Sequence, residues 1–392
     1  MIAPTNEAFR QEVREFMRSN LPDDIRAKVA EERMDLPKED QRRWHRILDK
    51  QGWAVPSWPK ELGGSGWTDE QFYIFERELS LADAPRNTVY GVGMLAPTII
   101  EYGTDQQKAE ILPRIKNADD FWCQGFSEPG AGSDLAALKC KAENKGDHYL
   151  INGSKMWTSE AHIADRMFGL FRTDSLGKKQ HGITFILVDM NAPGVEVSPI
   201  KTFDGGGTEI NQVFFTDVKV PIENRVGEEH QGWGLAKYLL SLERFGTAEV
   251  SRSMRTLQRL KAFASNQTRG NLRLIDDPDF KQRLTRAELT LRAVELTEYR
   301  LLFGGEPAGA EASLLKLKGT EVQNDILELL HDAVGVHALI DMGDPEEAGE
   351  LPAGPEEAGY AARAHFNFRK TMIYAGSNEI QKTIMAKAVL GL

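Results

Sequence analysis

The spacing of apolar residues changes twice along this 392-residue chain, and these changes constrain its fold more than any other feature. Early segments repeat apolar side chains every three to four positions, as amphipathic helices do, at residues 6–21, 38–52, 68–82 and 104–116. Short β-rich runs bounded by Gly, Asn, Asp or Pro follow at residues 149–152, 167–172, 182–190, 195–200 and 212–220. Helical spacing then returns at residues 232–265, 278–303, 309–340 and 377–390.

This order of helices, strands and helices predicts a mixed, mainly α fold with three parts. We place an N-terminal helical domain at residues 1–118, a middle β domain at 119–227 and a C-terminal helical domain at 228–392. Two segments, 266–279 and 341–359, interrupt the last domain. The second is rich in Glu, Gly and Pro and can bury little apolar area. We expect both segments to be exposed, mobile loops.

Charge and composition exclude several functions. A formal net charge of −11 provides no basic surface for binding phosphates, so we expect no nucleic-acid partner. No run approaches the roughly 18 apolar residues of a membrane-spanning helix, so we expect no membrane insertion. The two cysteines form no CxxC pair, which is typical of a reducing, cytoplasmic environment. The eight histidines show no ligand spacing, so no metal site is predicted.

The most specific string, at residues 125–137, reads Gly-Phe-Ser-Glu-Pro-Gly-Ala-Gly-Ser-Asp-Leu-Ala-Ala. Gly130 and Gly132 allow tight turns and close approach to a ligand, and the hydroxyls of Ser127 and Ser133 can bind its polar edge. By itself, a Gly-Ser loop is weak evidence for a binding site. Other strings in the chain strengthen it.

A second string, Gly-Ser-Lys-Met-Trp-Thr-Ser, follows at residues 153–159, and further strings occur at 102–108, 182–190 and 214–221. In this order they resemble the acyl-CoA dehydrogenase family over nearly the whole chain. The resemblance implies FAD bound between the β domain and the C-terminal helices, with Trp157 against the flavin ring. It places the flavin contacts at Gln124, Phe126, Ser127, Gly132, Ser133, Trp157 and Ser159, the adenine contacts at Ser377 and Glu379, and a substrate contact also at Ser133.

Residues 373–381 resemble a second signature of the family, in which a glutamate commonly stands between Tyr and Gly. That glutamate is the base that removes the proton from the carbon next to the thioester. Here Ala375 occupies the position, and a methyl side chain cannot accept a proton. The resemblance still implies that the backbone N–H of Ala375, together with a flavin ribityl hydroxyl, holds the thioester oxygen and stabilises developing negative charge.

Some members of the family, resembling isovaleryl-CoA dehydrogenase, place the base in a Leu-Glu-Arg string, which this chain has at residues 242–244. A helix would put Glu243 on the apolar face of Leu239, Leu240 and Val250, where a buried carboxylate is a stronger base. We predict Glu243 as the base; the alternative is a surface glutamate paired with a cation. Arg244 matches a substrate-binding arginine at the mouth of the site, and a solvated structural arginine is the alternative.

Two strings of the homotetrameric members are missing, an Arg-x-x-Phe-Gly segment through which one subunit contacts its neighbour's FAD and a later Gly-Gly-x-Gly segment. Residues 255–261 and 332–337 stand in their places. A different partner subunit would supply the missing contacts, and in this respect the chain resembles the large subunit of pimeloyl-CoA dehydrogenases. Loop insertions that displaced equivalent contacts are the alternative.

The resemblance thus predicts an enzyme that converts an acyl-CoA thioester to its trans-2-enoyl form, with FAD as hydride acceptor. It implies an electron-transfer flavoprotein as the next electron acceptor and a homo- or hetero-oligomer, a dimer or a tetramer. Three alternatives remain, and the last of them is an acyl-CoA-binding or scaffold protein without flavin. The first is a flavin monooxygenase or an enzyme like nitroalkane oxidase on the same fold, and the second is a non-catalytic partner subunit of a heteromeric dehydrogenase.

Overall fold

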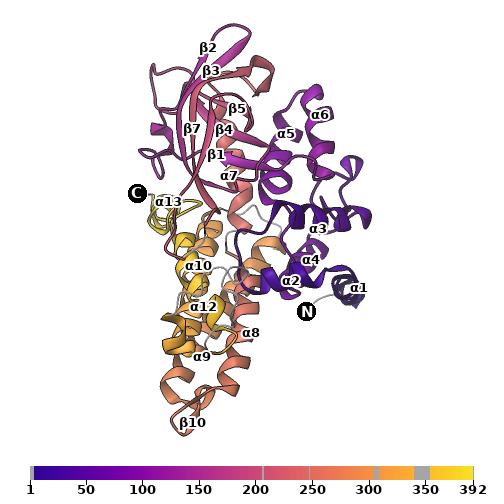
Figure 1. Ribbon diagram of the computed structural model, residues 1–392, viewed down its shortest axis with the longest axis vertical. Coiled ribbons are helices and arrows are strands. Elements are labelled where there is room, and N and C mark those ends of the chain that lie inside the picture. The colour runs from indigo at the N-terminus through magenta and orange to yellow at the C-terminus, as the bar shows by residue number, and fades with distance from the viewer. Residues whose placement is uncertain (1–3, 205–206, 247, 304–308, 340–353, 392) are drawn as a thin grey trace.

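The computed structural model describes residues 4–204, 207–246, 248–303, 309–339 and 354–391, with the backbone alone at residues 4–5 and 242–245. Helices, a sheet and further helices follow one another along the chain, which confirms the predicted fold class (Figure 1). None of the helices in these ranges combines the length and the apolar run that crossing a bilayer requires.

The N-terminal helices are α1 (Pro4–Asn20), α2 (Asp23–Ala30), α3 (Lys38–Lys50), α4 (Asp69–Leu81), α5 (Ala96–Tyr102) and α6 (Asp105–Lys116). Thr68 and Thr104 begin α4 and α6 with capping boxes, in which the threonine hydroxyl accepts the N–H of a glutamine three residues later. The apolar spacing predicted α1, α3, α4 and α6. It missed α2 and α5, which are too short to show a clear period, and the π-helical segment Val89–Leu95 before α5.

The sheet contains β1 (Trp122–Gly125), β2 (Lys141–Asn144), β3 (His148–Ser159), β4 (Arg166–Arg172), β5 (Ile183–Asp189), β6 (Val195–Pro199), β7 (Ile210–Pro221) and β8 (Arg225–Val226). Its strand order is β6-β7-β3-β2-β4-β5-β8, and β1 pairs with β4 in parallel. The long antiparallel pair β3 and β7 has register shifts between Ile151 and Gly153 and between Lys155 and Thr158. The second shift lies in the string at residues 153–159.

The C-terminal helices are α7 (Gly232–Gly246), α8 (Val250–Asn266), α9 (Pro278–Phe303), α10 (Ala310–Val334), α12 (Ala358–Asn367) and α13 (Asn378–Leu390). Residues 266–279, predicted as a mobile loop, contain the hairpin of β9 (Thr268–Arg269) and β10 (Leu272–Arg273) and a 3-10 turn that buries Leu274. Of the other predicted loop, residues 341–353 lie outside the described residues, and its end already belongs to α12.

The continuous helical pattern predicted at residues 232–265 is wrong, because the chain breaks between α7 and α8. Glu249 adopts the left-handed conformation, with φ 43° and ψ 43°. The break separates two hydrophobic cores. Leu235 and Leu239 of α7 pack with the N-terminal helices and one face of the sheet, whereas α8 packs with α9 and α10. Spacing alone did not reveal the break because each half has an apolar face.

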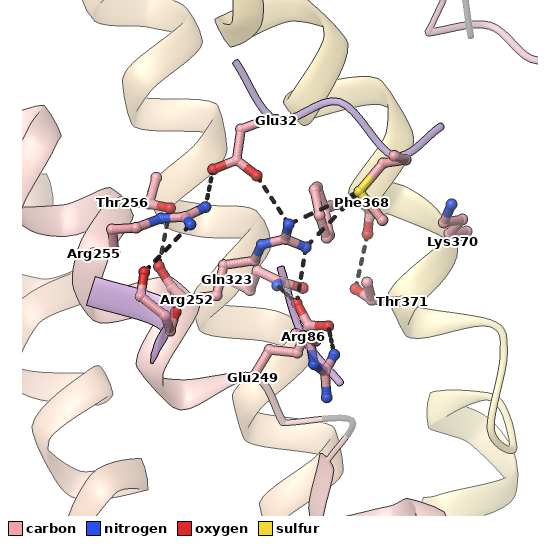
Figure 2. Close-up of polar contacts among 12 residues, drawn as sticks. Glu32, Arg86, Glu249, Arg252, Arg255, Thr256, Gln323, Phe368, Lys370 and Thr371 are labelled. Atoms are coloured by element: carbon pink, nitrogen blue, oxygen red, sulfur yellow. Dashed lines mark hydrogen bonds and ion pairs between the residues drawn. The ribbon is translucent and has the colours of Figure 1, made fainter. Parts of the chain in front are cut away.

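A buried ion-pair network joins α8 to the N-terminal domain (Figure 2). The Glu32 carboxylate, 3% exposed, pairs with Arg255 and, at 3.1 Å, with Arg252. Arg255 and Arg259 also pair with Asp83, at 3.1 and 2.6 Å. Arg252 continues to Glu249 at 3.3 Å. Electrostatic attraction thus connects the ends of α2 and α4 to the first turns of α8.

All three acidic residues of this network have left-handed backbones, with φ values of 56° for Glu32, 57° for Asp83 and 43° for Glu249. Such φ angles are unfavourable for residues with a β-carbon and persist where the surroundings hold them. The arginines of α8 stabilise these conformations because each one binds a carboxylate at a chain reversal.

Replacing Glu32 with Gln should lower the free energy of unfolding by about 3 to 5 kcal/mol at pH 7, because neighbouring guanidiniums lose a shared carboxylate. Burial raises the pKa of Glu32, but Arg255, Arg252 and Arg259 together hold it below the ordinary 4.5. This decrease in the free energy of unfolding should therefore have its full size above about pH 4.5 and become smaller as the pH falls further. Urea unfolding followed by tryptophan fluorescence measures it.

The control is Asp24→Asn, in the exposed pair between Asp24 and Arg43. This change should leave the free energy of unfolding nearly unchanged, because water screens an exposed pair. Equal losses in the two variants would show that burial adds nothing to the Glu32 network.

Candidate functional site

The loop at residues 125–137 begins where β1 ends, and its first residues are built into the core. An added β-carbon at Gly125 would lie 2.2 Å from the Met167 sulfur, so only glycine fits there. Phe126 is buried edge-on against Phe168 and Phe185, with ring centroids 6.0 and 6.3 Å away. Phe126 therefore anchors the start of the loop.

Glu128 holds the remainder of this loop through buried hydrogen bonds. Its carboxylate accepts the backbone N–H groups of Lys139 at 2.6 Å and Cys140 at 2.9 Å, and the ammonium of Lys155 at 2.8 Å. Lys155 is fully buried and also donates to the Leu170 carbonyl at 2.6 Å. The sequence reasoning missed both charged residues, although each belongs to one of the two quoted strings.

The tip of the loop is exposed, in contrast to its base. Gly130, Gly132 and Ser133 lie on the surface, and an added β-carbon at Gly130 or Gly132 would meet no atom within 4 Å. Contacts within the chain therefore do not require glycine here, which leaves close approach to a ligand as the reason for it. The Ser127 carbonyl accepts the Met156 N–H at 2.9 Å and ties the loop to β3.

Trp157 lies at the register shift of β3, with φ 63° and 56% of its surface exposed. A large aromatic side chain held outward on an unfavourable backbone is typical of a ligand platform. Ser159 continues the strand opposite Ile210. The irregular strand therefore presents the indole instead of burying it.

Two buried polar atoms near this platform have no partner among the described residues, Gln124 Nε2 on β1 and Thr158 Oγ1 on β3. Buried polar atoms nearly always have a hydrogen-bond partner, so these two fit the polar edge of a bound cofactor. The resemblance predicted Gln124 but not Thr158. The signal for Thr158 was its position between Trp157 and Ser159.

The segment at residues 373–377 forms a tight reversal before α13. Ala375 has φ 53°, and its carbonyl accepts Gln381 Nε2 at 2.9 Å. No described residue accepts the Ala375 N–H. Ser377 caps α13 by accepting the Ile380 N–H at 3.4 Å, and Glu379 is exposed in the first turn. The amide predicted to bind a thioester oxygen is therefore available.

Glu243 and Arg244 lie on the last turn of α7, and their side chains are outside the described residues. The helix itself packs against β5, α5, α10 and the π-helical segment. Its Leu239 is buried and Leu240 packs against the same core, but Val250, predicted on the same helix face, begins α8 beyond the break and packs in the other core. The structure thus describes the helix that carries Glu243 but not the direction of the carboxylate.

A titratable group next to Ser159 was missed by the sequence reasoning. Burial raises the pKa of Glu160 to about 7; a hydrogen bond from Gln41 opposes this shift, and the charge of Glu209 adds to it. The Gln41 contact is long, at 3.4 Å. Glu160 therefore changes charge near neutral pH, one residue from the predicted flavin contacts.

Models of three domains match the chain, the acyl-CoA dehydrogenase N-terminal domain at residues 3–119, middle domain at 123–218 and C-terminal domain at 230–390. Acyl-CoA dehydrogenase IpdE1 of Mycobacterium tuberculosis is 35% identical over 396 residues, which cover 98% of this chain and 97% of that protein. Acyl-CoA dehydrogenase FadE26 of the same species is 35% identical over 355 residues, 88% of this chain and 86% of the relative.

Solved structures with the same fold include two that are each named for two proteins. One is the Tcur3481-Tcur3483 steroid ACAD, with a TM-score of 0.86 and 31% identity, covering 100% of this chain and 98% of that one. The other is the ChsE4-ChsE5 complex from Mycobacterium tuberculosis, with a TM-score of 0.84, 31% identity and the same coverage.

Replacing Glu160 with Gln should stabilise the protein at pH 8 by about 2 to 3 kcal/mol, because the wild-type carboxyl must ionise in a buried site. The folded-state pKa, about 7, lies above the ordinary 4.5. The cost is therefore absent below about pH 4.5, grows between the two values and is constant above them. Urea unfolding at several pH values measures it.

Glu12→Gln is the control, because Glu12 is exposed on α1. It should leave the pH dependence unchanged. A Glu160→Gln effect that is the same at pH 5 and pH 8 would contradict the assigned ionisation.

Proposed function

The chain belongs to the acyl-CoA dehydrogenase family, and on this premise we propose that it oxidises an acyl-CoA thioester to the trans-2-enoyl-CoA, with FAD as cofactor. The observation that carries the proposal is the pairing of two features. The Ala375 amide has no described acceptor, and a Leu-Glu-Arg string stands on α7, which packs into the core with the sheet. A hydrogen-bond donor for the thioester oxygen and a candidate base are thus both present.

Glu243 removes the proton from the carbon next to the thioester carbonyl. The Ala375 N–H donates to the thioester oxygen and stabilises the negative charge that develops there. Bound FAD would supply the acceptor for the hydride of the neighbouring carbon. Arg244 binds the substrate at the mouth of the site, and Ser133 contacts it from the loop tip.

The FAD contacts are proposed at Gln124, Phe126, Ser127, Gly132, Ser133, Trp157, Ser159, Ser377 and Glu379. Support comes from the exposed Trp157 indole, the unpartnered Gln124 amide and the open glycine loop. Lys155 and Glu128 do not bind the cofactor in this proposal. They hold the loop and β3 together, so the two segments that carry most of the proposed contacts keep a fixed position relative to each other.

A second subunit and an electron-transfer flavoprotein are the proposed partners. The strings that complete a neighbour's FAD site are missing, and two structures similar to this chain are titled as pairs of proteins. Large apolar side chains are exposed near the C-terminal helices, among them Phe203, Leu339 and Ile373. Both cysteines are free and buried, which supports a reducing, cytoplasmic location.

Replacing Glu243 with Gln should slow anaerobic flavin reduction by acyl-CoA by roughly 100-fold or more, because the proton has no acceptor of comparable strength. Stopped-flow absorbance of the flavin band measures the rate, and the FAD content should be retained. In a Glu243→Gln/Ala375→Glu double variant, a base at the position usual in the family should restore part of the rate.

Glu12→Gln serves as the matched control for lost carboxylate charge. Unchanged turnover of the assembled complex in Glu243→Gln would instead support a non-catalytic subunit. Flavin that no acyl-CoA reduces, but that reacts with oxygen in the presence of another reductant, would support the oxygenase alternative.

Trp157→Ala should lower the FAD content of the purified complex, whereas Trp157→Phe should retain most of it, because stacking against the flavin ring needs an aromatic side chain. The ratio of flavin to protein absorbance measures the content. Equal FAD content and equal visible circular dichroism in the alanine variant would show that Trp157 does not contact the flavin.

A further inference from the structure

Helix α10 contacts both segments of the proposed catalytic apparatus. On one side it packs against α7 and α8, and on the other it packs along α13, which follows the reversal at Ala375. Gly319 allows a close approach on the first side, because an added β-carbon there would lie 2.8 Å from the backbone of Ala248. Gln323 donates to Glu249 at 3.1 Å (Figure 2). These contacts fix α10 against the break between α7 and α8.

A polar stripe runs along the other side of α10. Lys316, Thr320 and Asn324 recur every four residues, so the helix places them in one line. All three are buried, with 0%, 0% and 4% of their surface exposed. Buried polar groups are unfavourable unless they are hydrogen-bonded, so the partners of these side chains show what the stripe holds in place.

The first attachment point lies directly after the reversal at residues 373–377. Lys316 Nζ donates to Asn378 Oδ1 at 3.0 Å, and the Thr320 hydroxyl lies 3.3 Å from the same oxygen. Asn378 is buried and is the first residue of α13, next to the cap at Ser377. The stripe therefore holds the first turn of α13.

The second attachment point lies before the reversal, in the 3-10 turn Phe368–Met372. Asn324 Nδ2 donates to the Phe368 carbonyl at 3.3 Å and to the Thr371 hydroxyl oxygen at 3.2 Å. The Thr371 hydroxyl donates to the same carbonyl at 2.8 Å. The segment that contains the Ala375 N–H is thus held at both ends by one helix.

Lys316 differs from the other two members of the stripe in its charge. Hydrogen bonds from an ammonium are shorter and stronger than those from neutral donors, and a buried ammonium requires them. The held end of α13 is itself bonded to the reversal, because Gln381 Nε2 donates to the Ala375 carbonyl at 2.9 Å and to the Gly376 carbonyl at 3.2 Å. The position of Asn378 therefore determines where Ala375 lies.

The proposed reaction depends on the separation of two groups. Glu243 must reach the carbon next to the thioester carbonyl while the Ala375 N–H donates to the oxygen of that carbonyl. Both atoms belong to one small part of the substrate, so a displacement of about 1 Å can lower the rate by about 100-fold. The contacts of α10 with α7 and with the first turn of α13 limit this displacement.

We propose that Lys316 is a positioning residue of the dehydrogenation site, which holds the Ala375 amide, through Asn378, at a fixed place relative to the helix that carries Glu243. The inference rests on the proposed acyl-CoA dehydrogenation and adds a residue to it. Lys316 contacts neither the substrate nor FAD in this proposal and transfers no proton.

The test uses Lys316→Met in the assembled flavoprotein, because methionine keeps an unbranched side chain without the ammonium. The kcat for an acyl-CoA should fall by roughly 30-fold or more, whereas KM and the FAD content should change little. Infrared difference spectra of a bound 2-enoyl-CoA with an isotope-labelled thioester carbonyl provide a readout without turnover. The carbonyl stretch should lie at a higher frequency in the variant, because a weaker hydrogen bond from Ala375 leaves a stronger carbonyl bond.

Lys318→Met is the matched control, because the Lys318 side chain lies on the same helix, is 51% exposed and pairs with Glu321. It should leave kcat and the carbonyl stretch unchanged. Lys316→Gln keeps a donor without the charge and should restore part of both readouts; it also serves if Lys316→Met does not fold. Asn378→Ala removes the acceptor, and its effect should not add to that of Lys316→Met.

A Lys316→Met protein that unfolds at a lower temperature but keeps the wild-type kcat and carbonyl stretch would overturn the proposal. Additive effects of Lys316→Met and Asn378→Ala would also overturn it, because the route through Asn378 would then be wrong.

Failure of the proposed function would look different. In that case no acyl-CoA would reduce the flavin of the wild type, whereas backbone amide hydrogen exchange at residues 373–381 would still be faster in Lys316→Met than in the wild type and in Lys318→Met. Equal exchange in all three proteins would overturn the positioning role of Lys316 by itself.

Discussion

The ion pairs between α8 and the N-terminal domain decide where the two helical parts of the molecule meet. Glu32, Asp83 and Glu249 stand at chain reversals with left-handed backbones, and arginines of α8 bind all three. Arg252 also lies 4.4 Å from the centre of the Phe368 ring, so the network extends toward the second signature. A buried charge without its partner is strongly unfavourable, so each of these pairs restricts how α8 lies against the N-terminal domain.

The same network explains why the chain breaks after α7. Helix α7 packs in the core with the sheet, whereas α8, which continues the chain, packs in the C-terminal bundle. One straight helix could not pack in both cores. The break brings Glu249 back toward Arg86 and leaves the end of α7 beside Gly246 accessible to a cation. The ion pairs that join the domains thereby also hold the connection at the end of the helix that carries Glu243.

Ala375 stands where members of the family commonly carry a glutamate. The reversal at residues 373–377 is retained, with its left-handed alanine, its Gln381 hydrogen bond and its cap at Ser377. The backbone function of the segment depends on this reversal and not on the side chain at position 375. In the proposed function the base lies on another helix, α7, and the amide that binds the thioester oxygen is that of Ala375.

The sequence by itself determined the order of helices, sheet and helices, because apolar spacing records which face of each element is buried. The strings at residues 125–137, 153–159 and 373–381 could also be read from it, whereas the flavin contacts at Gln124 and Trp157 stay predictions from the resemblance. Only the tertiary structure revealed the break at Glu249, the Glu128–Lys155 pair, the unpartnered Thr158 hydroxyl and the placement of Arg86 beside α7. These features depend on contacts between residues far apart in the chain, and local spacing carries no information about which distant charges will meet.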